Sequence, residues 1–471
     1  MQPPSYSKNL IFPSGHAILN IAIDYKGRCN MKRFPRLHSS LFNLHDDRSR
    51  GRCVMLTSSI ICAINTWLTT DIFYTSFLMI YGIDLVNIGI IAFIPYIASC
   101  FSIFSPSLLE RFQKRRWVLV GGKLLYYTLN ILGITLVPVI VADPTLRVVC
   151  FASIIFLANL INALIGSGIS IWHLNFIPEH IRADYFLKQS TISSFIGIGI
   201  SLISGVVADA LSASPYANTI IILFRYVAYG LALIDVIVLA LPKEYPYPRS
   251  HDRPRLRDIV TMPFSSKPFM LTMLVIVLHT FCTNVPTSFV NYYLLNNVGV
   301  QYTYIYAINM VYPFMLLFLQ PIARRLINRF GWFKVLAVSM LIHAPSWVAY
   351  ACVTGGNYLW LFTATRIFQH VVGVCLNTAY SNIAYVNLPP RDQTNYYSFY
   401  LLGTNMSAFL GMMLGTGLIA LIGDHAPILL GMPFTSVQLL LLIQALGNLV
   451  VPVVIFSCFR MLDPNARLAA K

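Results

Sequence analysis

Apolar runs of about 20 residues recur along the chain, and this feature limits the possible folds more than any other. A helix of that length crosses the hydrocarbon core of a bilayer, which is about 30 Å thick. Only 11% of the 471 residues are charged, whereas a soluble domain contains roughly 25%. Because lipid offers no hydrogen bonds to the backbone, such runs must be helical. The sequence therefore predicts an all-α, polytopic membrane protein.

Twelve runs are candidates for transmembrane helices, and they form two groups of six. The first six are 55–80, 85–108, 117–141, 147–173, 190–211 and 219–241. The second six are 268–293, 303–323, 333–354, 358–384, 396–422 and 434–459. The expected domains are a basic tail (1–54), a first bundle (55–241), a linker (242–267), a second bundle (268–459) and a short tail (460–471). The composition of residues 1–30 offers no core of its own, so we expect Met31, and not Met1, to be the true start.

The formal net charge of +16 is placed in a way that favours a membrane over nucleic acid. Lys and Arg gather in the two tails and in every second loop, whereas the intervening loops contain only Arg147. By the positive-inside rule, both termini are expected in the cytoplasm. This placement requires an even number of spans, and it does so independently of the hydropathy.

The nine cysteines give no sign of a metal centre or a disulfide framework. Their number is odd, they lack CxxC spacing, and most of them lie inside apolar runs. Cysteines of this kind usually behave as small buried hydrophobic residues. We expect no metal and no cofactor.

Two short similarities indicate an internal repeat. "LLERFQKRRWVLV" from Leu108 is similar to "LINRFGWFKVLAV" from Leu326, at an offset of 218 residues. "IPEHIRADYF" from Ile177 is similar to "LPPRDQTNYY" from Leu388, at an offset of 211. Each pair falls between corresponding runs, so the two six-helix halves are expected to be parallel, pseudo-symmetric repeats.

Six plus six helices, a charged central loop, and basic loops after runs 2 and 8 resemble the major facilitator superfamily of transporters. The resemblance covers about residues 55–460. In that family the loop after span 2 carries Gly, three residues, Asp-Arg, one residue, Gly and then basic residues. The match here is degenerate, with Ser105 or Pro106 near the glycine, Glu110 for the acid, then Arg111 and a basic cluster.

The resemblance implies a conformational latch. Glu110 would cap the amino end of span 11, where the helix dipole favours negative charge, with Arg111 and Arg329 as its basic neighbours. In the second half Asn328 replaces the acid. The alternative is that the basic residues only follow the positive-inside rule.

Polar side chains inside the apolar runs are the candidate solute site, because an ionisable group at bilayer depth costs about 2.5–3.5 kcal/mol on insertion scales. The strongest helical face contains Arg366, Gln369, His370 and Asn377 in run 10. Run 1 places Trp67, Asp71 and Tyr74 on one face, and runs 4 and 7 contribute Asn159, Asn162, Thr283 and Asn284. The resemblance implies that spans 1, 4, 7 and 10 line the transport path, so these residues are the expected substrate-binding set.

Two roles stay open for Arg366, which lies too deep to reach the interface comfortably. It contacts the solute, or it pairs with Asp71. Asp71 is the preferred proton-coupling residue and His370 the second. Any single Asn or Thr can instead serve helix packing. Arg225 and Asp235 are ten residues apart, so we expect each to form structural pairs with other helices.

The resemblance implies a secondary transporter that moves a small organic solute by alternating access. No ATP-binding P-loop occurs, so an ion gradient or the solute gradient must drive transport. Proton-coupled symport in the cell membrane by a monomer is the first prediction. A proton-coupled efflux antiporter is the alternative. The resemblance weakens it, because drug antiporters of that family often carry Gly-Pro in span 5, whereas "TISSFIGIGISLISGVVAD" lacks a proline. A membrane-embedded transferase would need a catalytic cluster, and none stands out; we expect no enzyme.

Overall fold

The computed structural model describes residues 46–109, 111–112, 114–178, 181–244, 256–389, 393–423, 428–429 and 432–463. Within these residues, twelve helical segments are long and apolar enough to cross a membrane. This confirms the predicted all-α architecture with twelve spans. A single hairpin, in which Ile428 pairs with Pro433, is the one sheet among the described residues.

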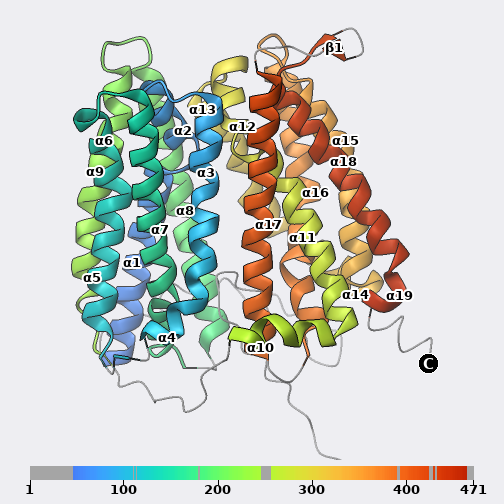
Figure 1. Ribbon diagram of the computed structural model, residues 1–471, viewed down its shortest axis with the longest axis horizontal. Helices are drawn as coiled ribbons and strands as arrows, with labels where there is room; N and C mark the ends of the chain where they lie inside the picture. Colours follow the sequence, from blue (N-terminus) through green and yellow to red (C-terminus); the bar gives the residue numbers. More distant parts are fainter. Residues whose placement is uncertain are drawn as a thin grey trace, which may run out of the picture.

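The first six spans consist of α1 to α9, which we call the N-terminal group. Its elements are α1 (Asp47–Thr69), α2 (Asp71–Ile80), α3 (Leu85–Cys100), η2 (Phe101–Phe104), α4 (Ser105–Leu109), α5 (Arg116–Tyr127), η3 (Thr128–Gly133), α6 (Ile134–Ile140), α7 (Pro144–Leu174), α8 (Arg182–Ala210) and α9 (Ala217–Leu239). In Figure 1 these helices stand together at the left, and α1 enters from below.

The last six spans form the C-terminal group, preceded by α10 (Leu256–Thr261) and η5 (Met262–Ser265). Its elements are α11 (Lys267–Thr287), α12 (Val290–Tyr292), η6 (Tyr293–Val298), α13 (Tyr302–Asn309), α14 (Val311–Phe330), α15 (Trp332–Ala351), α16 (Tyr358–Val386), α17 (Gln393–Ile422), β1 (Ile428–Leu429), β2 (Met432–Pro433), α18 (Ser436–Ser457) and α19 (Phe459–Leu462). We call the side of the molecule where α1 begins and α19 ends the base, and the opposite side the top (Figure 1).

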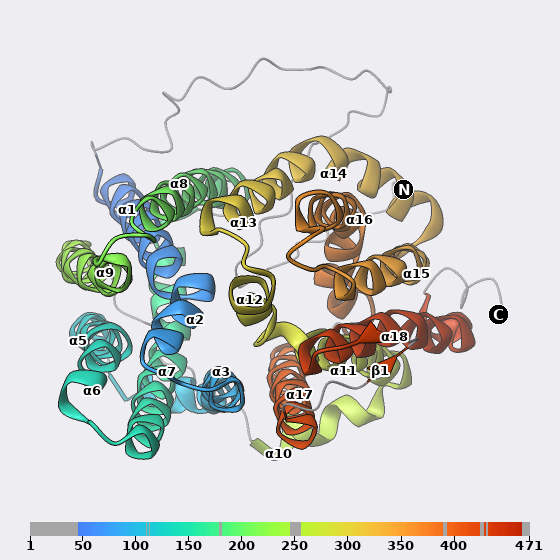
Figure 2. The ribbon, with the colours of Figure 1, turned by 90° about the horizontal axis from the view of Figure 1, so that it is seen from above.

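Spans 1 and 7 are the two longest of the twelve spans. Both are broken near the top, where α2 of span 1 and α12 of span 7 face each other (Figure 2). They have 34 and 32 residues, whereas about 20 suffice to cross a bilayer. Span 1 breaks between Thr69 and Asp71, and Asp71 has a left-handed backbone with φ of 54°. Span 7 breaks after Thr287, next to Pro286, which removes a helical donor.

Among the residues that the structure describes, buried apolar side chains form three clusters, and one of these joins the two groups. The cluster at the top combines residues of both, among them Phe73, Phe289 and Tyr306. The two clusters nearer the base each belong to one group: Trp172 lies in that of the N-terminal group, and Phe333 in that of the C-terminal group. The described structure is therefore closed at the top, while the groups have separate cores at the base.

Among the described residues, the groups contact each other most through three helix pairs: α3 with α17, α8 with α13, and α2 with α12. Aromatic rings meet between α3 and α17 and between α8 and α14. The rings of Phe93 and Phe409 are 5.2 Å apart between their centroids, and those of Phe195 and Phe314 are 5.9 Å apart. These contacts are edge to face, an arrangement that aromatic quadrupoles favour.

Candidate functional site

Arg366 on α16 is the centre of a polar site between the two groups. Its Nη1 donates to Oε1 of Gln369 at 3.0 Å, and its Nη2 donates to Oδ1 of Asn309 at 2.7 Å. Its guanidinium also lies 6.0 Å from the ring centroid of Tyr350. Both hydrogen-bond partners are neutral amides, so they leave the positive charge uncompensated. Guanidinium has five N–H donors, so donors remain for another group.

Asp71 approaches this site from the N-terminal group, and the break in span 1 places it there. Its Oδ1 accepts from Nδ2 of Asn291 on α12 at 2.5 Å. It lies close enough to Arg366 for the two charges to interact electrostatically, yet no ion pair among the described residues joins them. The left-handed backbone is tolerated by Asp better than by most residues. Such outliers persist only where the surrounding structure fixes them.

An aromatic wall connects Asp71 to α13. The rings of Trp67 and Tyr306 meet edge to face with centroids 6.1 Å apart, and Tyr306 also packs against Phe73 at 5.5 Å. Asp71 and Tyr306 are electrostatic neighbours. Trp67 and Asp71 of span 1 therefore meet the C-terminal group at one place.

Several buried polar atoms near Arg366 and Asp71 have no hydrogen-bond partner among the described residues. They are Nε2 of Gln369, Nε2 of His370 and the hydroxyl of Tyr306, on residues that are 4%, 7% and 2% exposed. His370 uses a backbone hydrogen bond with Ile308 to fix its ring. A buried polar group without a partner costs about 1–3 kcal/mol. These atoms are therefore suited to a bound molecule or to water.

Asn377 lies on the same face of α16 as Arg366 and is connected to His370 through Tyr312. Its Nδ2 donates to the hydroxyl of Tyr312 at 2.9 Å, and the Tyr312 ring lies 5.5 Å from that of His370. The face predicted from the sequence thus brings Arg366, Gln369, His370 and Asn377 into one connected set.

The other sequence candidates lie in different surroundings. Tyr74 stacks under the guanidinium of Arg225 at 5.7 Å, inside the N-terminal group. Asn159 and Asn284 donate to carbonyls of their own helices, those of Ile155 and Thr280, each at 2.8 Å. The carbonyl of Thr283 accepts from the Thr287 hydroxyl, and Asn162 is exposed. These contacts are typical of helix packing in membranes.

The predicted latch at the base stays a prediction, because Glu110 lies outside the described residues. Its expected neighbours are both exposed: Arg111 follows α4, and Arg329 lies in the last turn of α14. The guanidinium of Arg329 is 5.2 Å from the ring of Phe330.

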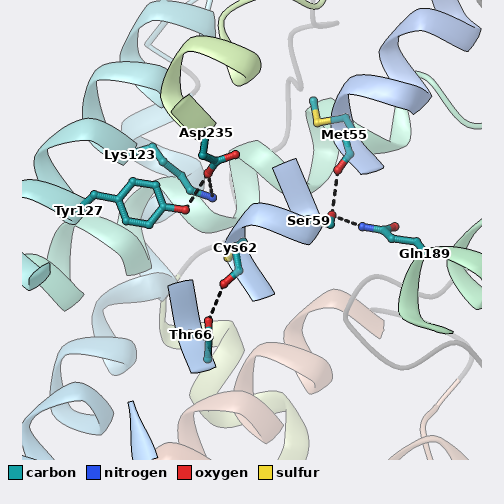
Figure 3. Close-up of polar contacts among 8 residues, drawn as sticks. All are labelled: Met55, Ser59, Cys62, Thr66, Lys123, Tyr127, Gln189 and Asp235. Carbon is teal, nitrogen blue, oxygen red and sulfur yellow. Dashed lines mark hydrogen bonds and ion pairs between the residues drawn. The ribbon is translucent and has the colours of Figure 1, made fainter. Parts of the chain in front are cut away.

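A second polar cluster lies inside the N-terminal group (Figure 3). Asp235 is fully buried; its Oδ2 accepts from the Tyr127 hydroxyl at 2.7 Å and lies 3.6 Å from Nζ of Lys123. Arg225 donates to Oγ1 of Thr135 at 2.8 Å. The prediction that Asp235 and Arg225 pair with other helices is therefore confirmed. Lys123 was overlooked, although a lysine inside an apolar run was a sufficient signal.

The chain has recognisable similarity to known proteins in sequence and in fold. Residues 272–470 match the family model of the Major Facilitator Superfamily. None of the curated protein sequences matches this chain. A crystal structure of a variant of the nucleoside transporter NupG is 14% identical, covers 88% of this chain and 100% of its own, and has a TM-score of 0.64.

Two further solved structures have the same fold. The POT family transporter PepTSo is 11% identical, with 89% of this chain and 98% of its own covered and a TM-score of 0.62. The E. coli fucose:proton symporter is 15% identical, with 88% and 99% covered and a TM-score of 0.53. At these identities the structures show the fold alone. The second half of the chain thus matches the family model of the Major Facilitator Superfamily, and the twelve-span fold of the described residues is similar to the folds of these solved transporters.

Proposed function

We propose that this protein is a secondary transporter of the major facilitator superfamily, and that it carries a small organic solute with a negatively charged group by proton-coupled symport across the cell membrane. The observation that carries the proposal is the guanidinium of Arg366, whose hydrogen bonds in the described structure go to neutral amides. A cation with neutral hydrogen-bond partners favours binding of an anion.

The hydrogen-bonding character of the site supports an acceptor-rich solute. The amide nitrogen of Gln369 can only donate, and the Tyr306 hydroxyl is also free to donate. Arg366 retains N–H groups beyond the two that it uses. A carboxylate supplies several acceptor positions, and it accepts two parallel bonds from a guanidinium. A zwitterion would add a cationic group, for which Asp71 is the available partner.

Proton coupling follows from the two charges that meet at this site. Ionised Asp71 competes with an anionic solute for the field of Arg366, since the two side chains interact electrostatically. Protonation of Asp71 removes that competition and strengthens solute binding. By thermodynamic reciprocity, the bound anion also strengthens proton binding. Mutual strengthening is what a symporter requires, and His370 is the second candidate for the proton.

The orientation is inferred from the described basic residues at the start of α5 and in the last turns of α14, which lie at the base. With the base in the cytoplasm, the described conformation is closed to the outside. The similar fold of the fucose:proton symporter is compatible with proton coupling in this architecture.

The test is ligand-dependent thermal stabilisation of the purified protein with pairs of compounds, each a carboxylate and its neutral amide. We expect stabilisation by carboxylates in the parent protein and its loss in Arg366→Gln. The matched control is Arg147→Gln, because Arg147 donates only to backbone carbonyls near the top. Equal stabilisation by a neutral amide in the parent and in Arg366→Gln would contradict the proposal.

A further inference from the structure

We propose that Asp209 and the start of α13 form a latch that holds the two groups together at the top, so that Asp209 is a positioning residue of the transport cycle. This inference rests on the fold and on alternating access in general. It does not depend on the identity of the solute or of the coupling ion.

Asp209 caps a helix of the opposite group with both of its carboxylate oxygens. Oδ1 accepts from the backbone N–H of Tyr302 at 3.1 Å, and Oδ2 accepts from that of Thr303 at 2.7 Å. These are the first two residues of α13. The first amides of a helix lack partners within it, and negative charge is favourable there. The bonds therefore join the carboxyl end of α8 to the amino end of α13. The carboxylate of Asp209 gains two donors, and the first two amides of α13 gain an acceptor.

Two other helices that begin at the top, α7 and α18, have side-chain caps that come from their own group. Asp143 caps α7 by accepting from the N–H of Leu146 at 2.7 Å. Thr435 and Gln438 form a reciprocal capping box at the start of α18. The residue that precedes α13, Gln301, makes no side-chain capping bond. α13 thus receives from the other group what α7 and α18 receive from adjacent sequence.

Asp209 lies at an electrostatically unfavourable position in its own helix. It is the penultimate residue of α8, and a negative charge at the carboxyl end of a helix is unfavourable. The amino end of α13 offsets that disadvantage only while the two helices are in contact. Separation of the groups at the top removes both benefits together.

Neighbouring residues fit α13 closely against α8 and α2. A Cβ on Gly205, one turn before Asp209, would lie 3.2 Å from the backbone nitrogen of Thr303 and 3.1 Å from the Tyr306 ring. The Tyr302 hydroxyl donates to Oγ of Ser76 at 2.8 Å. Its ring stacks on Phe73, with centroids 5.6 Å apart. The start of α13 is therefore held by two helices of the N-terminal group.

Alternating access requires these contacts to break when the top opens. Asp209 then passes from two backbone amides to water, and α13 loses its only side-chain cap among the described contacts. The latch thereby favours the top-closed conformation. Its release belongs to the step that opens the top.

The experiment measures spin-label distances in the full-length protein, with cysteines introduced in a background that lacks the native ones. One label pair, at Lys114 and Asn328, reports on the base; a second, at Ala213 and Thr354, reports on the top. For Asp209→Asn we expect the ratio of top-closed to top-open molecules to fall by about five- to tenfold, the scale of a charged helix cap. The top distance should lengthen while the base distance shortens.

The matched control is Asp143→Asn, which removes the same charge from a cap within one group and should leave both distances as in the parent. Gly205→Ala supplies a second, independent test and should shift the distances in the same direction as Asp209→Asn. Unchanged distances in both Asp209→Asn and Gly205→Ala would overturn the proposal. A shift of equal size in Asp143→Asn would do so too.

Discussion

Spans 1 and 7 occupy corresponding places in the two groups, and both are broken near the top by different means. Span 7 is broken next to a proline, Pro286, which lies in the last turn of α11. Span 1 contains no proline at its break and instead turns through the left-handed backbone of Asp71. Corresponding backbone breaks have therefore arisen from different local chemistry.

The comparison extends to the side chains at the breaks. Asp71 and Asn291 are hydrogen-bonded and lie 220 residues apart, close to the offsets of 218 and 211 between the repeated sequence segments. Equivalent positions of the two groups thus meet each other. One position carries a carboxylate that can bind a proton, and the other carries a neutral amide. The pseudo-symmetry of the backbone coexists with an asymmetry of charge, and in the proposed mechanism the proton binds to only one of the two groups.

The largest expected effect comes from Asp71→Asn, which makes the two breaks chemically alike. If Asp71 couples the proton, accumulation of solute against its gradient should be lost. Solute exchange at equal concentrations should persist, because the proton is not required for it. Reconstituted vesicles with and without a pH gradient, loaded with the carboxylate found by thermal stabilisation, distinguish the two processes. Retained pH-driven accumulation would assign the proton to another residue, with His370 tested next.

A second comparison concerns the buried charges of the N-terminal group. Lys123→Met leaves Asp235 fully buried beside only the Tyr127 hydroxyl, and loss of one partner of a buried ion pair costs about 3–5 kcal/mol. We expect such a loss in the free energy of unfolding, measured by denaturant titration in detergent. The double variant Lys123→Met with Asp235→Asn should recover part of it. No recovery would show that the pair acts through packing and not through charge.

The hydrogen bond between the breaks should have an intermediate effect. Asn291→Ala removes the donor to Asp71, and a hydrogen bond to a charged group contributes about 1.5–3 kcal/mol. We expect destabilisation of that size when Asp71 is ionised, and a smaller one in an Asp71→Asn background. Unfolding measurements on the four proteins of this double-mutant cycle provide the coupling energy. A coupling of zero would show that the two breaks do not support each other.

The smallest expected effect concerns the backbone of Asp71. Asp71→Gly and Asp71→Ala remove the same carboxylate, but only glycine adopts positive φ without steric cost. We expect the Gly variant to be more stable than the Ala variant by about 1–2 kcal/mol. The same comparison at Thr287, on the other break, should favour Ala, since no positive φ occurs there. Equal stability at position 71 would mean that the break relaxes when its side chain is lost.

The sequence was sufficient for the architecture because hydropathy and loop charge are local properties. The extent of each span was less predictable. Run 8 was expected to end at residue 323, whereas the helix continues to Phe330, because Arg324 and Arg325 lower the hydropathy without ending the helix. The break in span 1 had no local signal at all. No glycine or proline occurs in "TWLTTDIFY", so tertiary contacts must impose the left-handed turn.

For the site, helical spacing identified the face of α16 and the residues Trp67 and Asp71. It could not identify their partners. Asn309 and Tyr350 contact Arg366 through the packing of α13 and α15 against α16, and Tyr306 approaches Asp71 through the packing of the two groups. Spacing also admitted Tyr74 and Asn284, because it reports which residues share a face and not what that face contacts.

The apolar cluster shared by the two groups at the top has a consequence for temperature. Opening the top exposes part of this cluster to water, and exposure of apolar surface raises the heat capacity. The hydrophobic contribution that keeps the top closed weakens on cooling. The balance between the two conformations should therefore shift towards the top-open form in the cold, so that the affinity measured from either side of the membrane becomes a property of temperature as well as of the solute.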